Sequence, residues 1–283
     1  MQLTDSIRTV LVLGATGKTG RRLTPKLRER GITVREVSRK PGPGRTVFSW
    51  QDRATHAAAL AGVDAVYVIP PELVENPTEL TAPFLDEAGR ARVQRIVLVS
   101  SLGLAFPGEP ATSGRVALER QVTSSGLAWT LLRPSGFMQN FSEGFLAPGV
   151  KQGVLASATG DGAAAFIDAD DIAAAACAAL TEPGHAGATY ALTGPAALSF
   201  AQAAAAIGAV LGRTIAHRAI TSAEMTAMLV GFGLPAEYVA MLIRDQESIR
   251  SGAGALVTDD VLRVTGRVPT SFEAFARRAF VSG

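Results

Sequence analysis

The length, composition and charge of this chain exclude several classes of protein. Its 283 residues can bury a large core, and its hydrophobic fraction of 47% is ordinary for a globular protein. The net charge is only +2, and the apolar runs are too short to cross a bilayer. Basic residues gather on the predicted helix over residues 19–30, where a solvated face is favoured over the alternative of a nucleic-acid patch because no recognition motif accompanies them. The single cysteine, Cys177, cannot form an internal disulfide, and the three histidines lack metal-ligand spacing. We therefore expect a cytoplasmic protein with no metal site, no membrane contact and no nucleic-acid partner.

The first predicted strand, residues 10–13, runs into a glycine-rich turn. Gly14, Gly17 and Gly20 follow it, and a basic helix is expected over residues 19–30. Glycines let the backbone turn tightly and approach a pyrophosphate, and the helix N-terminus adds its partial positive charge. Strand, turn and helix in this order are typical of a dinucleotide fingerprint, here spaced G-x-x-G-x-x-G. The predicted cofactor contacts in this turn are Gly14, Thr16, Gly17, Lys18, Thr19 and Gly20.

Short β-rich runs alternate with helix-compatible segments as far as about residue 135. The predicted strands are residues 10–13, 33–38, 46–48, 65–69, 95–100 and 130–133. The predicted helices between them are residues 19–30, 53–61, 78–90 and 113–125. This alternation predicts an α/β fold, a Rossmann-like doubly wound parallel sheet with helices on both faces.

Ligands of such sheets bind at the carboxyl ends of the strands, so the residues after each run are site candidates. Arg39 and Lys40 follow the second run and suit a 2′-phosphate, whereas an NAD site usually has a carboxylate there. They favour NADP(H) over NAD(H), and the alternative is that both are solvated loop cations. The other cofactor candidates at strand ends are Asp52, Pro70, Ser100 and Pro134.

The reacting ring of the cofactor is expected near the fifth and sixth strand ends. Ser101 follows the fifth run and offers a small hydroxyl there. The chain then leaves the sheet after the sixth run, where Phe137, Met138 and Asn140 are the candidates for the substrate pocket.

The second half of the chain is richer in Ala and Gly and predicts a smaller α/β lobe. An Ala-rich helix over residues 172–180 follows Asp168 and Asp170, which we interpret as helix-capping residues rather than a catalytic pair. Further predicted elements are a strand at 189–192, a helix from a Ser199 cap to a Gly212 stop, a strand at 213–220, and helices at 222–230, 236–250 and from 268 through 278. We divide the chain into an NADP(H)-binding Rossmann domain, residues 1–140, and a substrate-binding lobe, residues 141–283, as one integrated unit whose segments can interleave.

Seven stretches in this order carry a resemblance to a known family: 13–20 (LGATGKTG), 37–39 (VSR), 95–101 (RIVLVSS), 126–134 (GLAWTLLRP), 137–140 (FMQN), 166–172 (FIDADDI) and 190–194 (YALTG). They resemble the NmrA-like branch of the atypical short-chain dehydrogenase/reductases, over nearly the whole chain. Within that branch, residues 48–52 (FSWQD) and 65–71 (AVYVIPP) look like festuclavine and agroclavine dehydrogenases, which reduce an iminium with NADPH.

The resemblance also reaches NADPH-dependent quinone reductases and azoreductases, and NmrA itself, a nucleotide-binding regulator. It implies NADP(H), a small aromatic or heterocyclic acceptor and a monomer or homodimer. In this family the lysine of the active-site helix holds the cofactor's ribose, and the matching position here is Arg115.

The larger superfamily uses a Tyr-x-x-x-Lys pair, and this chain lacks it. The residues four positions after Tyr67, Tyr190 and Tyr238 are Pro, Gly and Leu, and the tyrosine position of the matching helix falls on Ala111. Reduction of a ketone needs such an acid, whereas an iminium needs none and a quinone needs less.

We therefore expect direct hydride transfer from NADPH to a pre-activated iminium, quinone or azo acceptor. Ser101 is expected to donate a hydrogen bond to the acceptor, and Arg115 to hold the cofactor's ribose or carboxamide. The alternative is a non-catalytic NADP(H)-sensing regulatory protein of NmrA type.

Overall fold

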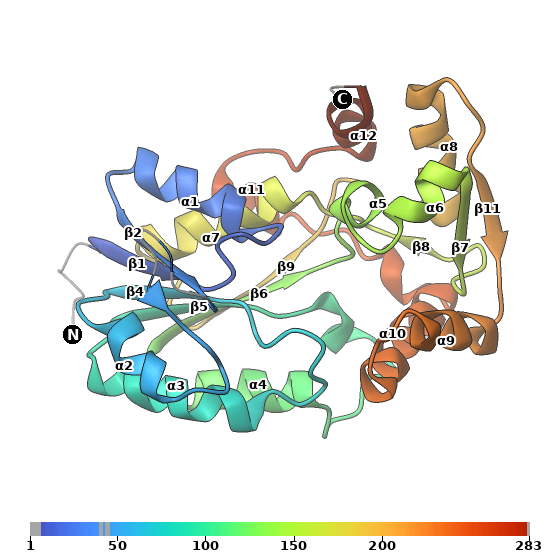
Figure 1. Ribbon diagram of the computed structural model, residues 1–283. Coiled ribbons are helices and arrows are strands. Elements are labelled where there is room, and N and C mark those ends of the chain that lie inside the picture. The colour runs from blue at the N-terminus through green and yellow to red at the C-terminus, as the bar shows by residue number, and fades with distance from the viewer. Residues whose placement is uncertain (1–6, 40–41, 43–45, 282–283) are drawn as a thin grey trace.

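One parallel sheet forms the centre of the fold (Figure 1). The computed structural model describes residues 7–39, 42 and 46–281, so the predicted site residue Lys40 lies outside the described residues. Seven strands pair in the order β3-β2-β1-β4-β5-β6-β9, each pair parallel. They are β1 (Thr9–Val12), β2 (Thr33–Ser38), β3 (Thr46–Val47), β4 (Ala65–Val68), β5 (Arg95–Val99), β6 (Ala128–Pro134) and β9 (Ala188–Leu192). The first six follow the Rossmann order, which confirms the predicted doubly wound α/β fold.

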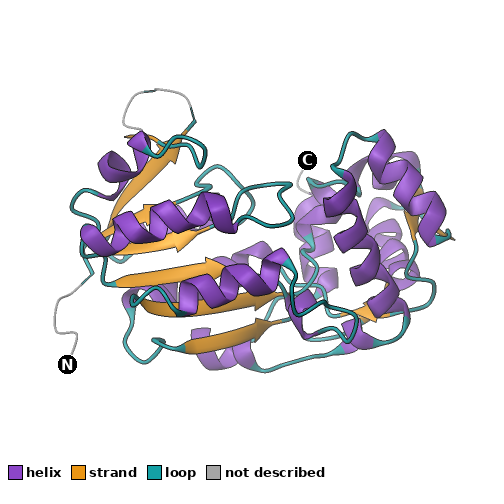
Figure 2. Cartoon of the chain, turned by 90° about the horizontal axis from the view of Figure 1, so that it is seen from below, coloured by secondary structure: helices purple, strands orange, loops and turns teal. Residues whose placement is uncertain are grey.

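Alternate side chains of the strands face two separate cores, because successive residues of a strand point to opposite faces. Val10 and Val12 pack with Tyr67 on one face, and Leu11 and Leu13 pack on the other. The helices over the first face are α1 (Gly20–Glu29), α7 (Ala169–Thr181) and α11 (Asp260–Thr265). Those over the second face are α2 (Ala54–Leu60), α3 (Thr78–Arg90) and α4 (Gly114–Thr123). Figure 2 shows the helices of the second face in front of the sheet.

The smaller lobe lies beyond the carboxyl ends of the sheet strands (Figures 1 and 2). Its strands form two short pairs, β7 (Val154–Ser157) parallel to β11 (Ala216–Ala219) and β8 (Ala163–Ala164) antiparallel to β10 (Leu198–Ser199). Its helices are α5 (Gln139–Ser142), α6 (Ala147–Gln152), α8 (Phe200–Leu211), α9 (Ser222–Gly231), α10 (Ala236–Arg250) and α12 (Phe272–Val281). The two short 3-10 helices are η1 (Leu102–Ala105) and η2 (Ala253–Ala255).

Segments from the second half of the chain return to the sheet. Strand β9 pairs with β6, α7 packs on the sheet beside α1, and α11 packs against α7. The Asp260 carboxylate of α11 accepts a hydrogen bond from the Ala191 N–H of β9 at 2.7 Å. Residues on both sides of position 140 therefore build the sheet layer.

Local capping signals set several helix ends where the sequence predicts them. Ser199 and Gln202 form a reciprocal capping box at the start of α8, and Gly212 ends it in the left-handed conformation. Asp168 caps α7 by accepting from the Asp170 N–H, as expected, although α7 starts three residues before the predicted position 172. The last helix starts at Phe272 rather than at 268, after a Ser271 hydroxyl that accepts from the Ala274 N–H.

Candidate active site

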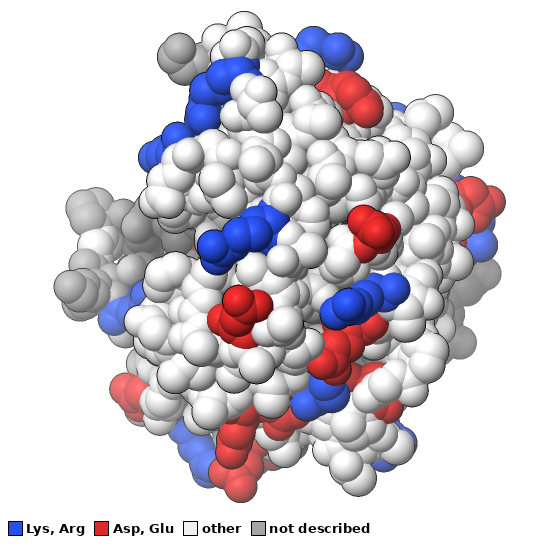
Figure 3. Space-filling view, turned by 90° about the vertical axis from the view of Figure 1, so that its right-hand side faces the viewer, with Lys and Arg blue, Asp and Glu red and all other residues white. Residues whose placement is uncertain are grey.

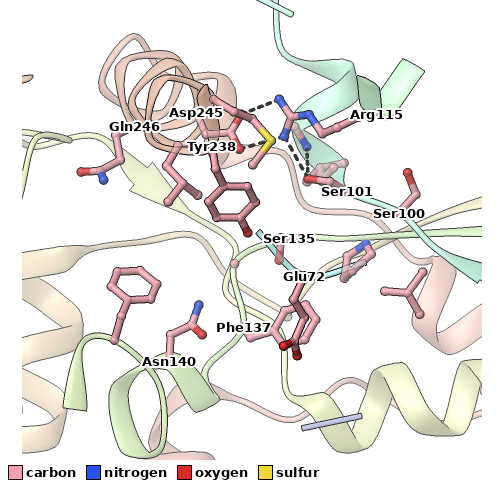
Figure 4. Close-up of a pocket in the computed structure, with 18 of the residues that line it drawn as sticks. Glu72, Ser100, Ser101, Arg115, Ser135, Phe137, Asn140, Tyr238, Asp245 and Gln246 are labelled. Atoms are coloured by element: carbon pink, nitrogen blue, oxygen red, sulfur yellow. Dashed lines mark hydrogen bonds and ion pairs between the residues drawn. The ribbon is translucent and has the colours of Figure 1, made fainter. Parts of the chain in front are cut away.

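A cavity of about 570 Å³ opens at the carboxyl ends of β1, β4, β5 and β6, and the smaller lobe closes its far side (Figure 4). Its wall contains eleven of the predicted site residues: Gly14, Gly17, Lys18, Thr19, Pro70, Ser100, Ser101, Arg115, Pro134, Phe137 and Asn140. The position follows from the fold, because parallel strands present their carboxyl ends at one edge of the sheet.

The turn after β1 requires glycine at two positions for steric reasons. Gly14 has φ +69°, and a side chain at Gly20 would place its Cβ 2.2 Å from the Gly14 carbonyl oxygen. No side chain among the described residues caps the start of α1, and the Thr19 hydroxyl accepts a hydrogen bond from buried Tyr67 at 2.8 Å. A glycine turn on the cavity wall and an uncapped helix start fit the pyrophosphate of a dinucleotide.

Lys18 adds a positive charge to this end of the cavity. Its Nζ donates to the Asn140 Oδ1 at 3.1 Å, which joins the glycine turn to α5. Burial lowers the pKa of Lys18, and the carboxylates of Glu143 and Glu72 act in the opposite direction. A half-buried ammonium group favours a bound phosphate as a charge partner.

Arg115 lies on the opposite wall, where it joins α4 to α10. Its guanidinium binds both carboxylate oxygens of Asp245 at 2.9 Å, contacts the Glu109 carboxylate through Nε at 3.0 Å and through Nη2, and reaches the Ser101 Oγ at 3.4 Å. Burial alone would lower the Arg115 pKa, but the bonds to Glu109 and Asp245 raise it. These contacts use all five N–H donors of the guanidinium, so the predicted contact with a ribose or carboxamide requires an exchange of partners.

The rest of the cavity wall is mainly apolar. Phenylalanine rings line it. One comes from the loop after η1 and the others from segments before and after β8 in the sequence; they include Phe106, Phe137, Phe141, Phe166 and Phe200. Phe141 and Phe166 pack edge to face with ring centroids 5.2 Å apart. Such a wall suits a planar apolar ligand and keeps water from it.

The remaining predicted residues lie away from this cavity. Thr16, Arg39 and Asp52 are exposed, and Asp52 accepts a hydrogen bond from the Ala54 N–H at the start of α2. Gly20 lies behind the turn, and Met138 is buried in the core of the smaller lobe, 1% exposed. A role for these residues in binding the cofactor or substrate stays a prediction.

The sequence interpretation did not include the residues that α9 and α10 bring to the cavity. On α10 they are Tyr238, Met241, Leu242, Asp245, Gln246 and Ile249. Their spacing of three and four residues could have predicted that they share one face of a helix. It does not predict what that face contacts. Glu72, in the loop between β4 and α3, also lines the cavity.

In the described part of the chain, every helix is too short or too polar to span a membrane. Within the same residues, no group of three or more His, Cys, Asp or Glu side chains is arranged to hold a metal ion.

Comparison with known proteins gives the class. Residues 14–183 match the NAD(P)H-binding family. The chain is 37% identical to an uncharacterised oxidoreductase, YesF, of Bacillus subtilis, with 94% of this chain and 93% of the relative covered. It is 35% identical to an NAD(P)H azoreductase of Xenophilus azovorans (95% and 96% covered) and 34% identical to festuclavine dehydrogenase of Aspergillus fumigatus (95% and 97%).

Solved structures agree on the fold. An NADPH-dependent quinone oxidoreductase of Escherichia coli superposes with a TM-score of 0.79 at 24% identity, covering 96% of this chain and 99% of the other. NmrA superposes with a TM-score of 0.73 at 18% identity, covering 98% and 97%. Fold and relatives thus define the class of NAD(P)H-dependent reductases. The chain belongs to the NAD(P)H-binding family, and its resemblance to NmrA-like proteins and clavine dehydrogenases is confirmed.

Proposed function

We propose that this protein is an NADPH-dependent reductase that delivers hydride to a pre-activated aromatic or heterocyclic acceptor. The observation that carries the proposal is the cavity itself. The glycine turn and Lys18 form one end of it, and an apolar aromatic wall forms the other. When bound, the cofactor supplies the hydride, and the chain supplies binding, orientation and exclusion of water.

The preference for NADPH rests on charge. Arg39 is exposed at the end of β2, the position where a carboxylate would meet the ribose of NAD. A guanidinium there matches a 2′-phosphate. Exchange of Arg39 for Ala should weaken NADPH binding and leave NADH binding unchanged, and equal effects on the two would overturn the preference.

Ser101 is the proposed donor on the sheet side of the acceptor. Its Oγ accepts from the Gly103 N–H at 3.1 Å and from Arg115, which fixes the oxygen. Both contacts use lone pairs, so the hydroxyl hydrogen is left to donate into the cavity. Ser101→Ala should lower turnover of an acceptor that bears a carbonyl oxygen.

The acceptor class follows from what the chain lacks and from what its relatives are called. Ala111 occupies the tyrosine position and lies in the loop before α4. Relatives are named an azoreductase and a festuclavine dehydrogenase. Iminium, quinone and azo groups all accept hydride without a strong acid, so they are the proposed acceptors.

The test is consumption of NADPH by the purified protein, with NADH as the control cofactor. The acceptors are a cyclic iminium, a small quinone and an azo dye. Saturable, enzyme-dependent oxidation with one of them establishes a reductase and ranks the classes. Tight NADPH binding without turnover of any acceptor would instead favour the non-catalytic sensor.

A further inference from the structure

One face of α10 forms the wall of the cavity opposite the sheet. Tyr238 and Asp245 stand seven residues apart on this face, and the side chains between them that reach the cavity are Met241 and Leu242. Figure 4 shows the Tyr238 ring extending from α10 with its hydroxyl in the cavity, between the Ser101 side and the Phe137 side. That hydroxyl forms no hydrogen bond with any group that the structure describes.

The Tyr238 phenol is held in its neutral form. Burial raises its pKa, the nearby Asp245 carboxylate raises it further, and Arg115 acts in the opposite direction. The other charged group that faces it is Glu72, which also disfavours a phenolate. At neutral pH the side chain therefore offers an O–H donor, not a base.

The helix that carries Tyr238 is tied to α4 by a two-point ion pair. Asp245 meets the Arg115 guanidinium through two bonds of 2.9 Å, and Arg115 also holds the Ser101 hydroxyl. Two turns of helix connect Asp245 to Tyr238, so the ion pair holds the α10 backbone at Tyr238 on the same cavity wall as Arg115 and Ser101.

We propose that Tyr238 is the hydrogen-bond donor for acceptors that develop negative charge on oxygen or nitrogen, so that α10 supplies a phenol donor where the Tyr-x-x-x-Lys helix supplies one elsewhere. This inference rests on the proposed function and deepens it. In a quinone, hydride and its electron pair add to the acceptor, and one oxygen becomes anionic. That oxygen accepts a hydrogen bond from the neutral Tyr238 hydroxyl as its charge develops, and it then takes its proton from water, which leaves hydroxide.

The experiment compares Tyr238→Phe with the wild type on two acceptors. Loss of the donor should lower kcat for a small quinone by about 10²-fold, the effect of removing one donor to a developing anion. Reduction of a cyclic iminium should change by less than about twofold, since hydride addition there removes positive charge and needs no acid. Equal losses on both acceptors, or no loss on either, would overturn the proposal.

The matched control is Tyr190→Phe, which also removes one phenol oxygen. The Tyr190 hydroxyl meets His185 Nδ1 at 2.9 Å, and Tyr190 is not in the cavity wall. This variant should reduce the quinone at the wild-type rate. NADPH affinity and the melting temperature of each variant establish that the proteins are folded.

A binding measurement separates failure of this inference from failure of the proposed function. Benzophenone accepts a hydrogen bond, and without NADPH it cannot be reduced. Its Kd for the cofactor-free protein should rise about fivefold in Tyr238→Phe, one hydrogen bond's contribution, and stay unchanged in Tyr190→Phe. If the wild type reduced no acceptor, the proposed reductase function would be rejected, but the benzophenone Kd would still test whether Tyr238 donates a hydrogen bond. An unchanged Kd in Tyr238→Phe would overturn that role of Tyr238.

Discussion

Lys18 is the residue at which charge, burial and ligand binding meet. Its ammonium group is half-buried in the cavity wall and bonded to Asn140, and burial lowers its pKa from the ordinary value of 10.5. A phosphate bound beside it favours the charged form and raises the pKa again. Binding therefore takes up a proton at any pH between the two pKa values, and the affinity falls as the pH rises through that window.

This linkage gives a pH prediction for Lys18. As the pH rises, the affinity for NADPH should start to fall before pH 10.5 is reached, because the Lys18 pKa is lowered from that value. The fall should be up to about tenfold per pH unit. In Lys18→Arg the guanidinium stays protonated, so the affinity should remain level over the same range. Titration of cofactor fluorescence across the alkaline range measures both curves. Parallel curves for the two proteins would show that Lys18 does not face the phosphates.

Gly20 tests the steric basis of the glycine turn. An added methyl group would lie 2.2 Å from the Gly14 carbonyl oxygen and 2.9 Å from the Ala15 Cα, so the backbone has to move. Gly20→Ala should lower the free energy of unfolding by about 1–3 kcal/mol and abolish tight NADPH binding. Gly89→Ala is the control, because Gly89 lies within α3 with no atom within 4 Å of a new Cβ. It should raise stability by up to about 1 kcal/mol, and equal melting temperatures of the two variants would contradict the argument.

At the scale of elements, α10 is held against α4 by charge. The side chains of Arg115 and Asp245 are 11% and 22% exposed, so the pair is screened only in part. Asp245→Asn removes one carboxylate and leaves Glu109 to neutralise Arg115. We expect a loss of about 1–2 kcal/mol of stability, less than for a fully buried pair. The KM for the acceptor should rise, because Asp245 holds the α10 wall of the cavity against α4.

The control for the Asp245 prediction lies on the same helix. Glu237 is exposed on α10, and Glu237→Gln removes a carboxylate of the same helix away from the cavity. Steady-state kinetics and chemical denaturation of both variants provide the comparison. A similar rise of KM in both would assign the effect to the net charge of the helix rather than to the contact with Arg115.

Elements with local signals were predictable from the sequence, and those defined by distant partners were not. Helix α8 has both its capping box and its glycine stop in the sequence, and both its ends match the prediction. Strand β7 is only four residues long and pairs with β11, whose residues lie about sixty positions later, so no local pattern identifies it. Helix α11 was missed for the same reason, since it is a six-residue segment that packs on α7.

In the candidate site, too, the residues set by the order of elements were predictable, and those set by distant contacts were not. The rule that ligands meet strand ends placed Ser100, Ser101 and Pro134 on the cavity wall, because it depends only on the order of elements. The rule could not tell which of two successive residues faces the cavity. Phe137 lines the cavity, whereas the next residue, Met138, is buried in the core of the smaller lobe. To assign the α10 residues to the cavity, one has to know that Arg115 contacts Asp245. These two residues are 130 positions apart, so only the folded chain shows the contact.

At the scale of the whole molecule, the cavity lies between two lobes that share one sheet layer. β9 and α11 come from the second half of the chain and pack with elements of the first half. The outer face of the smaller lobe carries scattered charges of both signs on a mostly uncharged surface (Figure 3). The lobes are joined by the shared sheet and by the ion pair of Arg115 and Asp245 on the cavity wall.

This sharing predicts a single cooperative unfolding transition. Unfolding of residues 141–283 alone would strip β9 from β6 and expose the face of the sheet that α7 covers, so neither part can unfold first without disrupting the other. NADPH at about 100 times its Kd should add about 2.7 kcal/mol and raise the whole transition by several degrees. Calorimetry, with far-UV and tryptophan signals, measures both effects; Trp50 and Trp129 report on the sheet domain. Two separated transitions, or a shift confined to one signal, would show that the lobes unfold independently and that the cofactor stabilises only one of them.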